Sequence, residues 1–169
     1  MEKNHVLFGF CVQAGGSLGV DFRPEENREI SIQLILEEKA EATVRILYHG
    51  RGVSTFTCHT CQRHMGNNSQ STVLVRCVCE DSARVDYHGK IEIPKEVIGV
   101  RAIQEHKNLV FSENVCIHTE PAMNVHSKDA ECFHGAAIGG IDTDVLQYFF
   151  MRGMERPLAQ ECYIAGFLN

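Results

Sequence analysis

Cysteine and histidine are the side chains of this sequence with the most chemical potential. Eight of the 169 residues are cysteines and nine are histidines. Thiolates and imidazoles bind zinc and iron–sulfur clusters, and a cysteine beside a histidine can act as a nucleophile with its base. A chain of this length buries enough surface to fold without disulfides or a metal. The thiols therefore point to sulfur or metal chemistry, or to small buried apolar residues.

Four cysteines have a spacing close to that of a structural zinc site. Cys58-x-x-Cys61 precedes Cys77-x-Cys79 by fifteen residues, and the second pair is one residue short of the usual spacing. Two histidines could substitute as ligands, His59 and His64. The second pair lies in a strand pattern, whereas zinc-binding pairs normally lie in turns. A zinc or cluster site and inert thiols both remain open.

Two further pairs lie nearer the C-terminus. Cys116 and His118 alternate with apolar residues, so they face outward if the apolar residues are buried. Cys132 and His134 share one strand face in the same way. Same-face neighbours on a strand are roughly 6–7 Å apart at the backbone, which is long for a nucleophile and its base. Ligand roles are therefore favoured over a thiol enzyme, and we expect no enzymatic activity.

Alternating hydrophobicity predicts strands through most of the chain. The first two alternating runs cover residues 30–36 and 44–48, and a third covers residues 72–79. Shorter strand patterns follow at residues 84–88, 90–93, 108–111 and 115–118. Residues 29–141 contain no sustained apolar stripe of helical period. The pattern favours a mainly β architecture over alternating βαβ units.

The last part of the chain predicts a helical hairpin. Asp142 or Thr143 can cap a first helix that ends near Gly153, and Pro157 suits the first turn of a second helix that stops at Gly166. The expected buried stripe of the second helix is Leu158, Ala159, Cys162 and Tyr163. We therefore divide the chain into a β core, 1–141, and a helical segment, 142–169. The hairpin could cover an open end of the core or bind a partner.

Charge and hydropathy exclude several classes of protein. The net charge of −6 argues against binding to nucleic acid or an anionic membrane. No segment approaches the ~18 apolar residues of a membrane helix, and the N-terminus lacks the pattern of a secretory signal. We expect a cytoplasmic protein, in which thiols stay reduced or bind metal.

The C-terminal region combines several distinctive motifs. Residues 132–142 read Cys-Phe-His-Gly-Ala-Ala-Ile-Gly-Gly-Ile-Asp, and Arg152-Gly153 and Gly166-Phe167-Leu168 follow. Together they resemble the C-terminal signature of the SufB/SufD family, scaffold subunits of iron–sulfur cluster assembly in the SUF system. Upstream, Tyr87-x-Gly89-x-Ile91 and His118-Thr119-Glu120-Pro121 are similar to the repetitive β region of that family. The resemblance extends from about residue 44 to the end.

The resemblance implies a fold and a set of partners. The family core is a right-handed parallel β-helix followed by a small C-terminal helical domain. The implied function is that of a noncatalytic scaffold that works with a separate ABC-type ATPase, SufC, and with itself or a second SufB/SufD-type subunit. The ATPase would dock on residues 143–168. Candidate contact residues are Gln147, Met151, Met154, Glu155 and Arg156.

The resemblance also implies ligands for a transient iron–sulfur cluster. Cys116 matches a cysteine of SufB-type members, and His134 matches a histidine that SufD-type members use at their shared interface. Cys132 is an additional candidate, with His118 beside Cys116. The alternatives are a β-helical interaction module and a zinc-binding structural protein, both without cluster chemistry.

The intervals between some of these residues suggest a common stripe. The interval from Cys58 to Cys77 is close to that from Cys116 to His134. The interval between Cys77 and Cys116 is twice the first within one residue. Because a β-helix stacks equivalent positions coil upon coil, similar intervals could place these side chains on one longitudinal stripe.

Overall fold

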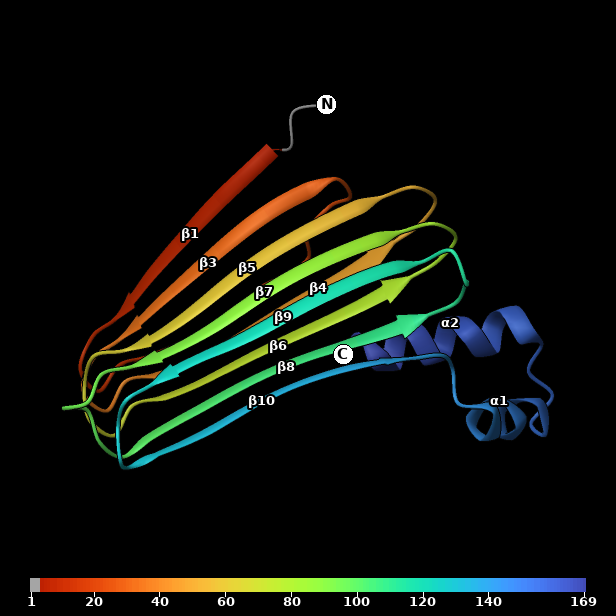
Figure 1. Ribbon diagram of the computed structural model, residues 1–169. Coiled ribbons are helices and arrows are strands. Elements are labelled where there is room, and N and C mark those ends of the chain that lie inside the picture. Colours follow the sequence, from red (N-terminus) through yellow and green to blue (C-terminus); the bar gives the residue numbers. More distant parts are fainter. Residues whose placement is uncertain (1–3) are drawn as a thin grey trace.

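The structure, a computed structural model, describes residues 4–169 as ten strands followed by two helices (Figure 1). The strands are β1 (Asn4–Val12), β2 (Ser17–Phe22), β3 (Arg28–Leu36), β4 (Glu41–Gly50), β5 (Thr55–His64), β6 (Gln70–Cys79), β7 (Arg84–Ile93), β8 (Val100–Val110), β9 (Cys116–Val125) and β10 (Ala130–Gly139). The helices are α1 (Thr143–Phe150) and α2 (Arg156–Phe167). The prediction of a mainly β chain that ends in two helices is confirmed.

The strands alternate between two parallel sheets that face each other. The odd-numbered sheet has the order β1-β3-β5-β7-β9, and the even-numbered sheet has the order β10-β8-β6-β4-β2. Each odd strand and the even strand after it form one coil of a β-solenoid (Figure 1). The predicted parallel β-helix is therefore confirmed. Parallel strands buried against a second sheet need apolar side chains on the inner face, and the alternation supplies them.

The alternating positions of the sequence line the interior. The buried residues of β3 include Ile32, Leu34 and Leu36. The buried residues of β4 include Val44, Ile46 and Tyr48. The interior also holds polar side chains that bond to one another. Most of these are in the middle coils: Thr60, Gln62, His64, Ser69, Ser71, Gln104, His106 and Asn108.

The coils are longer than the cysteine intervals suggested. Arg28 on β3 pairs with Phe56 on β5, and Arg84 on β7 pairs with Cys116 on β9. One coil is therefore much longer than the interval from Cys58 to Cys77. Two residues separated by that interval lie on facing sheets rather than at equivalent positions of successive coils. Cys58 lies on β5 and Cys77 on β6, in different sheets. The single stripe of cysteines expected from these intervals is wrong.

The helical hairpin lies beside the even-numbered sheet. Asp142 caps α1, and its carboxylate accepts a hydrogen bond from the amide of Asp144 at 2.8 Å. The side chain of Arg76 on β6 donates to the carbonyl oxygen of Phe167 at 3.1 Å and lies over the Phe167 ring. Arg76 alternates with the inward-facing residues of β6, so α2 ends on the outer face of this sheet. Within residues 4–169, no helix is long and apolar enough to span a membrane.

The buried face of α2 differs from the expected one. Ala159 is buried, but Leu158 and Cys162 are exposed, which corrects two members of the predicted stripe. Helix α2 packs mainly against the short helix α1, and its C-terminal end contacts Arg76 of β6. Gly166 lies inside the helix, which ends at Phe167 rather than before it.

Candidate functional site

The last coil, like the first, is an open end of the described solenoid. Strands β9 and β10 are edge strands of the described sheets, so each has a neighbour on one side only. Phe133 and Ile138 of β10 are more than half exposed, and Met123 of β9 is 44% exposed. An unpaired strand edge with apolar side chains is a surface that can pair with another chain.

Cys116 begins β9 and faces solvent together with His118. Both side chains are exposed, whereas Val115 and Ile117 are half-buried and pack against the main core. The predicted orientation of this pair is therefore confirmed. Neither side chain lies inside the solenoid, so both can reach a ligand or a partner from the outer face of the odd-numbered sheet.

Cys132 and His134 face the interior from β10. Cys132 is half-buried and packs against the core cluster of the last coils, and burial raises the pKa of its thiol. A raised pKa is the opposite of what a thiolate nucleophile needs. The Nδ1 atom of His134 is buried and has no hydrogen-bond partner. An unpartnered buried nitrogen is unusual, and the Nδ1 atom of His134, which has no partner among residues 4–169, is free to bind a group from outside the chain.

The two pairs do not meet within the chain. Strand β10 runs back along the coil after β9, so the beginning of β9 lies at the opposite end from the beginning of β10 (Figure 1). Cys116 also faces outward, whereas Cys132 and His134 face inward. Among the residues that the structure describes, no three His, Cys, Asp or Glu side chains are arranged to hold a metal ion. A complete ligand set must therefore include groups from elsewhere.

The four cysteines with zinc-like spacing are also separated. Cys58 faces the interior and is fully buried, but Cys61 is half-buried on the outer face, because residues three apart on a strand point to opposite sides. Cys77 and Cys79 are fully buried on the facing sheet. The quartet therefore does not surround one ion.

Burial makes the interior thiols unreactive. Burial raises the pKa of Cys58 and of Cys77 far above the ordinary range, and raises the pKa of Cys79 to about 12. Cys77 lies 3.7 Å from the Nε2 atom of His106, whose pKa burial lowers to about 4. Both groups are thus neutral near pH 7. No role was expected for His106, because its contact with Cys77 depends on the register between β6 and β8.

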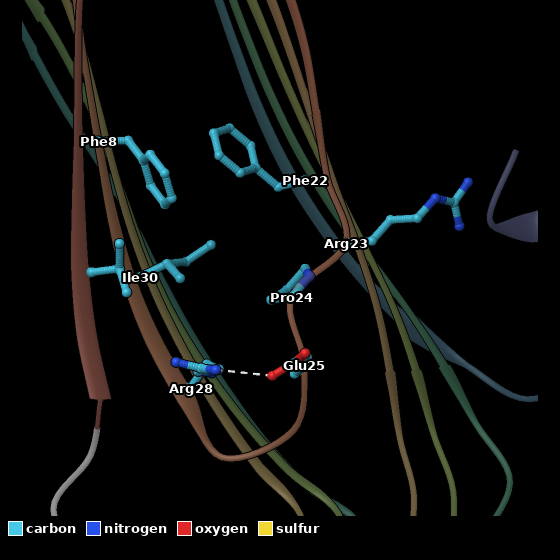
Figure 2. Close-up of a pocket in the computed structure, with 8 residues that line it drawn as sticks. Phe8, Phe22, Arg23, Pro24, Glu25, Arg28 and Ile30 are labelled. Carbon is cyan, nitrogen blue, oxygen red and sulfur yellow. Dashed lines mark hydrogen bonds and ion pairs between the residues drawn. The ribbon is translucent and has the colours of Figure 1, made fainter.

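A separate apolar pocket lies at the opposite end of the solenoid, in the first coil (Figure 2). Its volume is about 270 Å³, and the rings of Phe8 and Phe22 lie 4.7 Å apart at its wall. An ion pair of 2.9 Å between Arg28 and Glu25 borders it. The lining residues are Val6, Phe8, Phe22, Arg23, Pro24, Glu25, Arg28 and Ile30. None of the predicted ligands belongs to this lining.

A group that the sequence analysis left unassigned lies on the outer face of the odd-numbered sheet. His59 on β5 pairs in register with His88 on β7, and their rings stack with centroids 4.8 Å apart. Burial, together with His88, lowers the pKa of His59. The interval from His59 to His88 matches one coil, and this interval is the only sequence feature that could have predicted the pair. The strand pattern alone does not give the length of a coil.

Comparison with known proteins identifies the family to which these features belong. The model of the SUF system FeS cluster assembly SufBD core domain matches residues 27–167. The chain belongs to the SufBD family. This family is one of iron–sulfur cluster assembly, and the resemblance found in the sequence is confirmed. The match begins in the turn before β3, earlier than the resemblance did.

Several SufBD relatives are similar at low sequence identity. The chain is 26% identical over 140 residues to an iron-sulfur cluster assembly SufBD family protein of Synechocystis sp., and 26% identical over 128 residues to SufD of Escherichia coli. It is 30% identical over 119 residues to SufD of Bacillus subtilis. The matches cover 81%, 75% and 70% of this chain, but only 30%, 30% and 27% of those proteins.

Proposed function

We propose that this chain is a noncatalytic scaffold that holds a transient iron–sulfur cluster together with a second SufB/SufD-type subunit or a second copy of itself. The observation that carries the proposal is the last coil, where His134 has a buried, unpartnered Nδ1 atom beside the thiol of Cys132 at an unpaired sheet edge. A cluster takes four protein ligands, and no three converge among the described residues. The missing ligands would come from the partner.

Cys116 would supply a thiolate from the outer face of the same coil, with His118 beside it. The cluster would contain iron and sulfide as cargo, so the scaffold needs accessible ligands rather than a permanent cage. Exposed Cys116 fits this requirement better than the interior cysteines, whose pKa values burial raises. Zinc in place of a cluster would need the separated quartet to converge, and the facing directions of Cys58 and Cys61 oppose this.

Anaerobic reconstitution with iron and sulfide, in the presence of a SufC-like ATPase, tests the cluster proposal. We expect a brown chromophore with bound iron and sulfide, which Cys116→Ser and His134→Ala abolish. The matched control is Cys11→Ser, because Cys11 is also exposed but lies in the first coil. Cluster binding that is unchanged in both test variants, or absent from the unaltered chain, would contradict the proposal.

The second part of the proposal is that the helical segment, residues 142–169, binds the ABC-type ATPase through residues 143–168. Support comes from its exposed apolar side chains: Tyr148 and Leu158 are about half exposed and Met151 is 87% exposed. The other candidate contacts differ in exposure: Gln147, Glu155 and Arg156 are exposed, whereas Met154 is half-buried.

Co-purification with a SufC-like ATPase tests this docking surface. Met151→Asp should prevent co-purification, because it places a charge on the most exposed apolar side chain of the segment. Val53→Asp is the control, because Val53 is 83% exposed in the turn between β4 and β5, outside the helical segment. Equal co-purification of both variants would contradict docking through this segment.

An interaction module without cluster chemistry is the second candidate. The observation that favours it is the separation of Cys116 from Cys132 and His134 within the coil. In that case, binding of the ATPase would survive Cys116→Ser and His134→Ala, and no chromophore would form with any partner. The two experiments together distinguish the candidates.

A further inference from the structure

The connection between the two C-terminal helices projects away from the solenoid. In Figure 1, α1 and the turn into α2 lie beyond the ends of the neighbouring strands, whereas α2 runs back toward them. Tyr148 is 52% exposed, Met151 is 87% exposed and Arg152 is also exposed. These three residues share one side of α1, because they are three and four positions apart and the helical turn continues through residues 151 and 152. With Arg156 at the start of α2, we call them the hairpin tip.

The side chain of Arg152 is held in place before any partner binds. Its guanidinium carbon lies 3.5 Å from the centroid of the Tyr148 ring, and its Nη1 atom donates to the carbonyl oxygen of Tyr148 at 3.4 Å. Fixing a long side chain in advance lowers the entropy that binding must remove. The guanidinium has five N–H donors, so most of them remain available to a partner.

Both arginines of the hairpin tip lack a counter-charge. None of the ion pairs among residues 4–169 includes Arg152 or Arg156. Arg156 also lies in the first turn of α2, which contains no acidic residue. The partial positive charge at the beginning of a helix disfavours a cation there. Carboxylates of a partner would supply the missing counter-charge to both side chains.

The hairpin tip differs in charge from the chain as a whole. The chain has a net charge of −6, whereas residues 151–156 contain two arginines and one glutamate. Like charges repel across an interface and unlike charges attract. A carboxylate-bearing surface would therefore be repelled by most of this chain and attracted at the tip. The charge pattern fits an acidic partner surface rather than a basic one.

The exposed thioether of Met151 supplies an apolar anchor beside these charges. Methionine is flexible and fills irregular apolar pockets, and tyrosine and arginine are enriched among the residues that dominate binding energy. We infer that the hairpin tip inserts Met151 into an apolar pocket of the ABC-type ATPase, and that carboxylates on the rim of that pocket pair with Arg152 and Arg156. This inference rests on the proposed docking of the ATPase and adds the chemistry of the surface that docks.

Association of the whole chain with a SufC-like ATPase, measured by biolayer interferometry at two salt concentrations, tests the carboxylate rim. Raising the salt from about 50 mM to about 500 mM screens charge pairs, so the affinity of the unaltered chain should fall at least about tenfold. Arg152→Glu should lower the affinity at least about tenfold at the lower salt concentration, largely through slower association. The same variant should lose most of the salt dependence.

Two further variants separate the position of the charge from the charge itself. Arg101→Glu makes the same change on β8, at an arginine whose side chain is 62% exposed, and its affinity should equal that of the unaltered chain. Arg152→Lys keeps the charge but loses the planar group that covers the Tyr148 ring. It should keep the salt dependence and bind with intermediate affinity. Circular dichroism checks that each variant folds.

The outcomes distinguish this inference from the docking proposal on which it rests. If Met151→Asp prevents binding but Arg152→Glu binds as the unaltered chain does, the docking segment stands and the carboxylate rim is wrong. Equal weakening by Arg152→Glu and Arg101→Glu would assign the effect to net charge and would also overturn the inference, as would an affinity that does not depend on salt. If the unaltered chain does not bind the ATPase, both proposals are wrong.

Discussion

The interior and the outer surface of the solenoid contain the same reactive residue types in opposite states. Inside, Cys58, Cys77 and Cys79 are buried and have raised pKa values, and His106 is buried and neutral. Outside, Cys116 is exposed beside His118. Eight cysteines therefore do not amount to eight ligands. Strand alternation and position along the solenoid divide them into buried thiols of the middle coils, and exposed or half-buried thiols elsewhere.

Thiol labelling provides the largest expected contrast between the two regions. Cys11, Cys116 and Cys162 should react at once with a thiol reagent in native buffer, because they are exposed. The interior cysteines should react only when the chain opens, so their labelling should be slower by about a thousandfold or more. Mass spectrometry of quenched samples measures each rate. Fast labelling of Cys58 would show that the interior is open to solvent.

Coil stacking should be far more sensitive in the middle of the solenoid than at its end. A Cβ atom at Gly66 would lie 2.0 Å from the amide nitrogen of Glu38 in the preceding coil, whereas one at Gly139 would meet nothing within 4 Å. Gly66→Ala should therefore cost about 3 kcal/mol or more of unfolding free energy. Gly139→Ala should change it by less than about 1 kcal/mol. Urea denaturation of both variants makes the comparison, and equal losses would contradict it.

The interior histidines should make the protein sensitive to moderate acid. Burial lowers the pKa of His64 and of His106 to about 4, whereas an unfolded histidine has a pKa near 6.5. The unfolded state binds more protons between these values, so stability is complete above pH 6.5 and falls as the pH drops toward 4. The loss is about 1.4 kcal/mol per pH unit and per histidine.

Denaturation curves between pH 7 and pH 4.5 measure this slope. His64→Gln should be less stable at pH 7, because it removes the imidazole that forms 2.8 Å hydrogen bonds with the hydroxyls of Ser69 and Ser71. Its stability should nevertheless depend less on pH. His126→Ala, which changes a histidine outside the buried core, should keep the full slope. A slope that is the same in His64→Gln would mean that His64 is already charged inside the solenoid.

The smallest effect should come from the contact between the helical hairpin and the even-numbered sheet. Arg76→Ala removes both the hydrogen bond to the Phe167 carbonyl and the cation–π contact with its ring. We expect a loss of about 1 kcal/mol, expressed as faster amide exchange in α2 rather than as unfolding of the strands. Arg101→Ala is the control, because Arg101 is exposed on β8 and approaches Glu131 only at 3.9 Å. Unchanged exchange in α2 would show that other contacts hold the hairpin.

Much of the fold could be predicted from local pattern. Alternation in residues 30–36 and 44–48 predicted strands and their buried faces, and Asp142 and Pro157 predicted the starts of both helices. The outward direction of Cys116 followed from the same alternation. The buried stripe of α2 was less predictable, because Leu158 and Cys162 are buried or exposed according to what packs against the helix. The hydrophobic pattern shows which side chains favour burial, but it does not show which element packs against them.

Local sequence pattern did not predict the number of residues in each coil. Asn4 on β1 pairs with Arg28 on β3, whereas Arg84 on β7 pairs with Cys116 on β9, so the later coil is the longer one. The turns between strands vary in length, and the register of each strand depends on all the turns before it. Register therefore could not be derived from strand pattern.

The residue pattern by itself determined a mainly β chain, the inner and outer residues of its strands and the terminal hairpin, and the resemblance to the SufBD family supplied the β-solenoid class. Tertiary structure decided which chemical groups meet. Register sets His59 against His88 and places Cys77 beside His106, and it separates Cys116 from Cys132. The physical reason is that contact across coils depends on the summed lengths of the turns rather than on local periodicity.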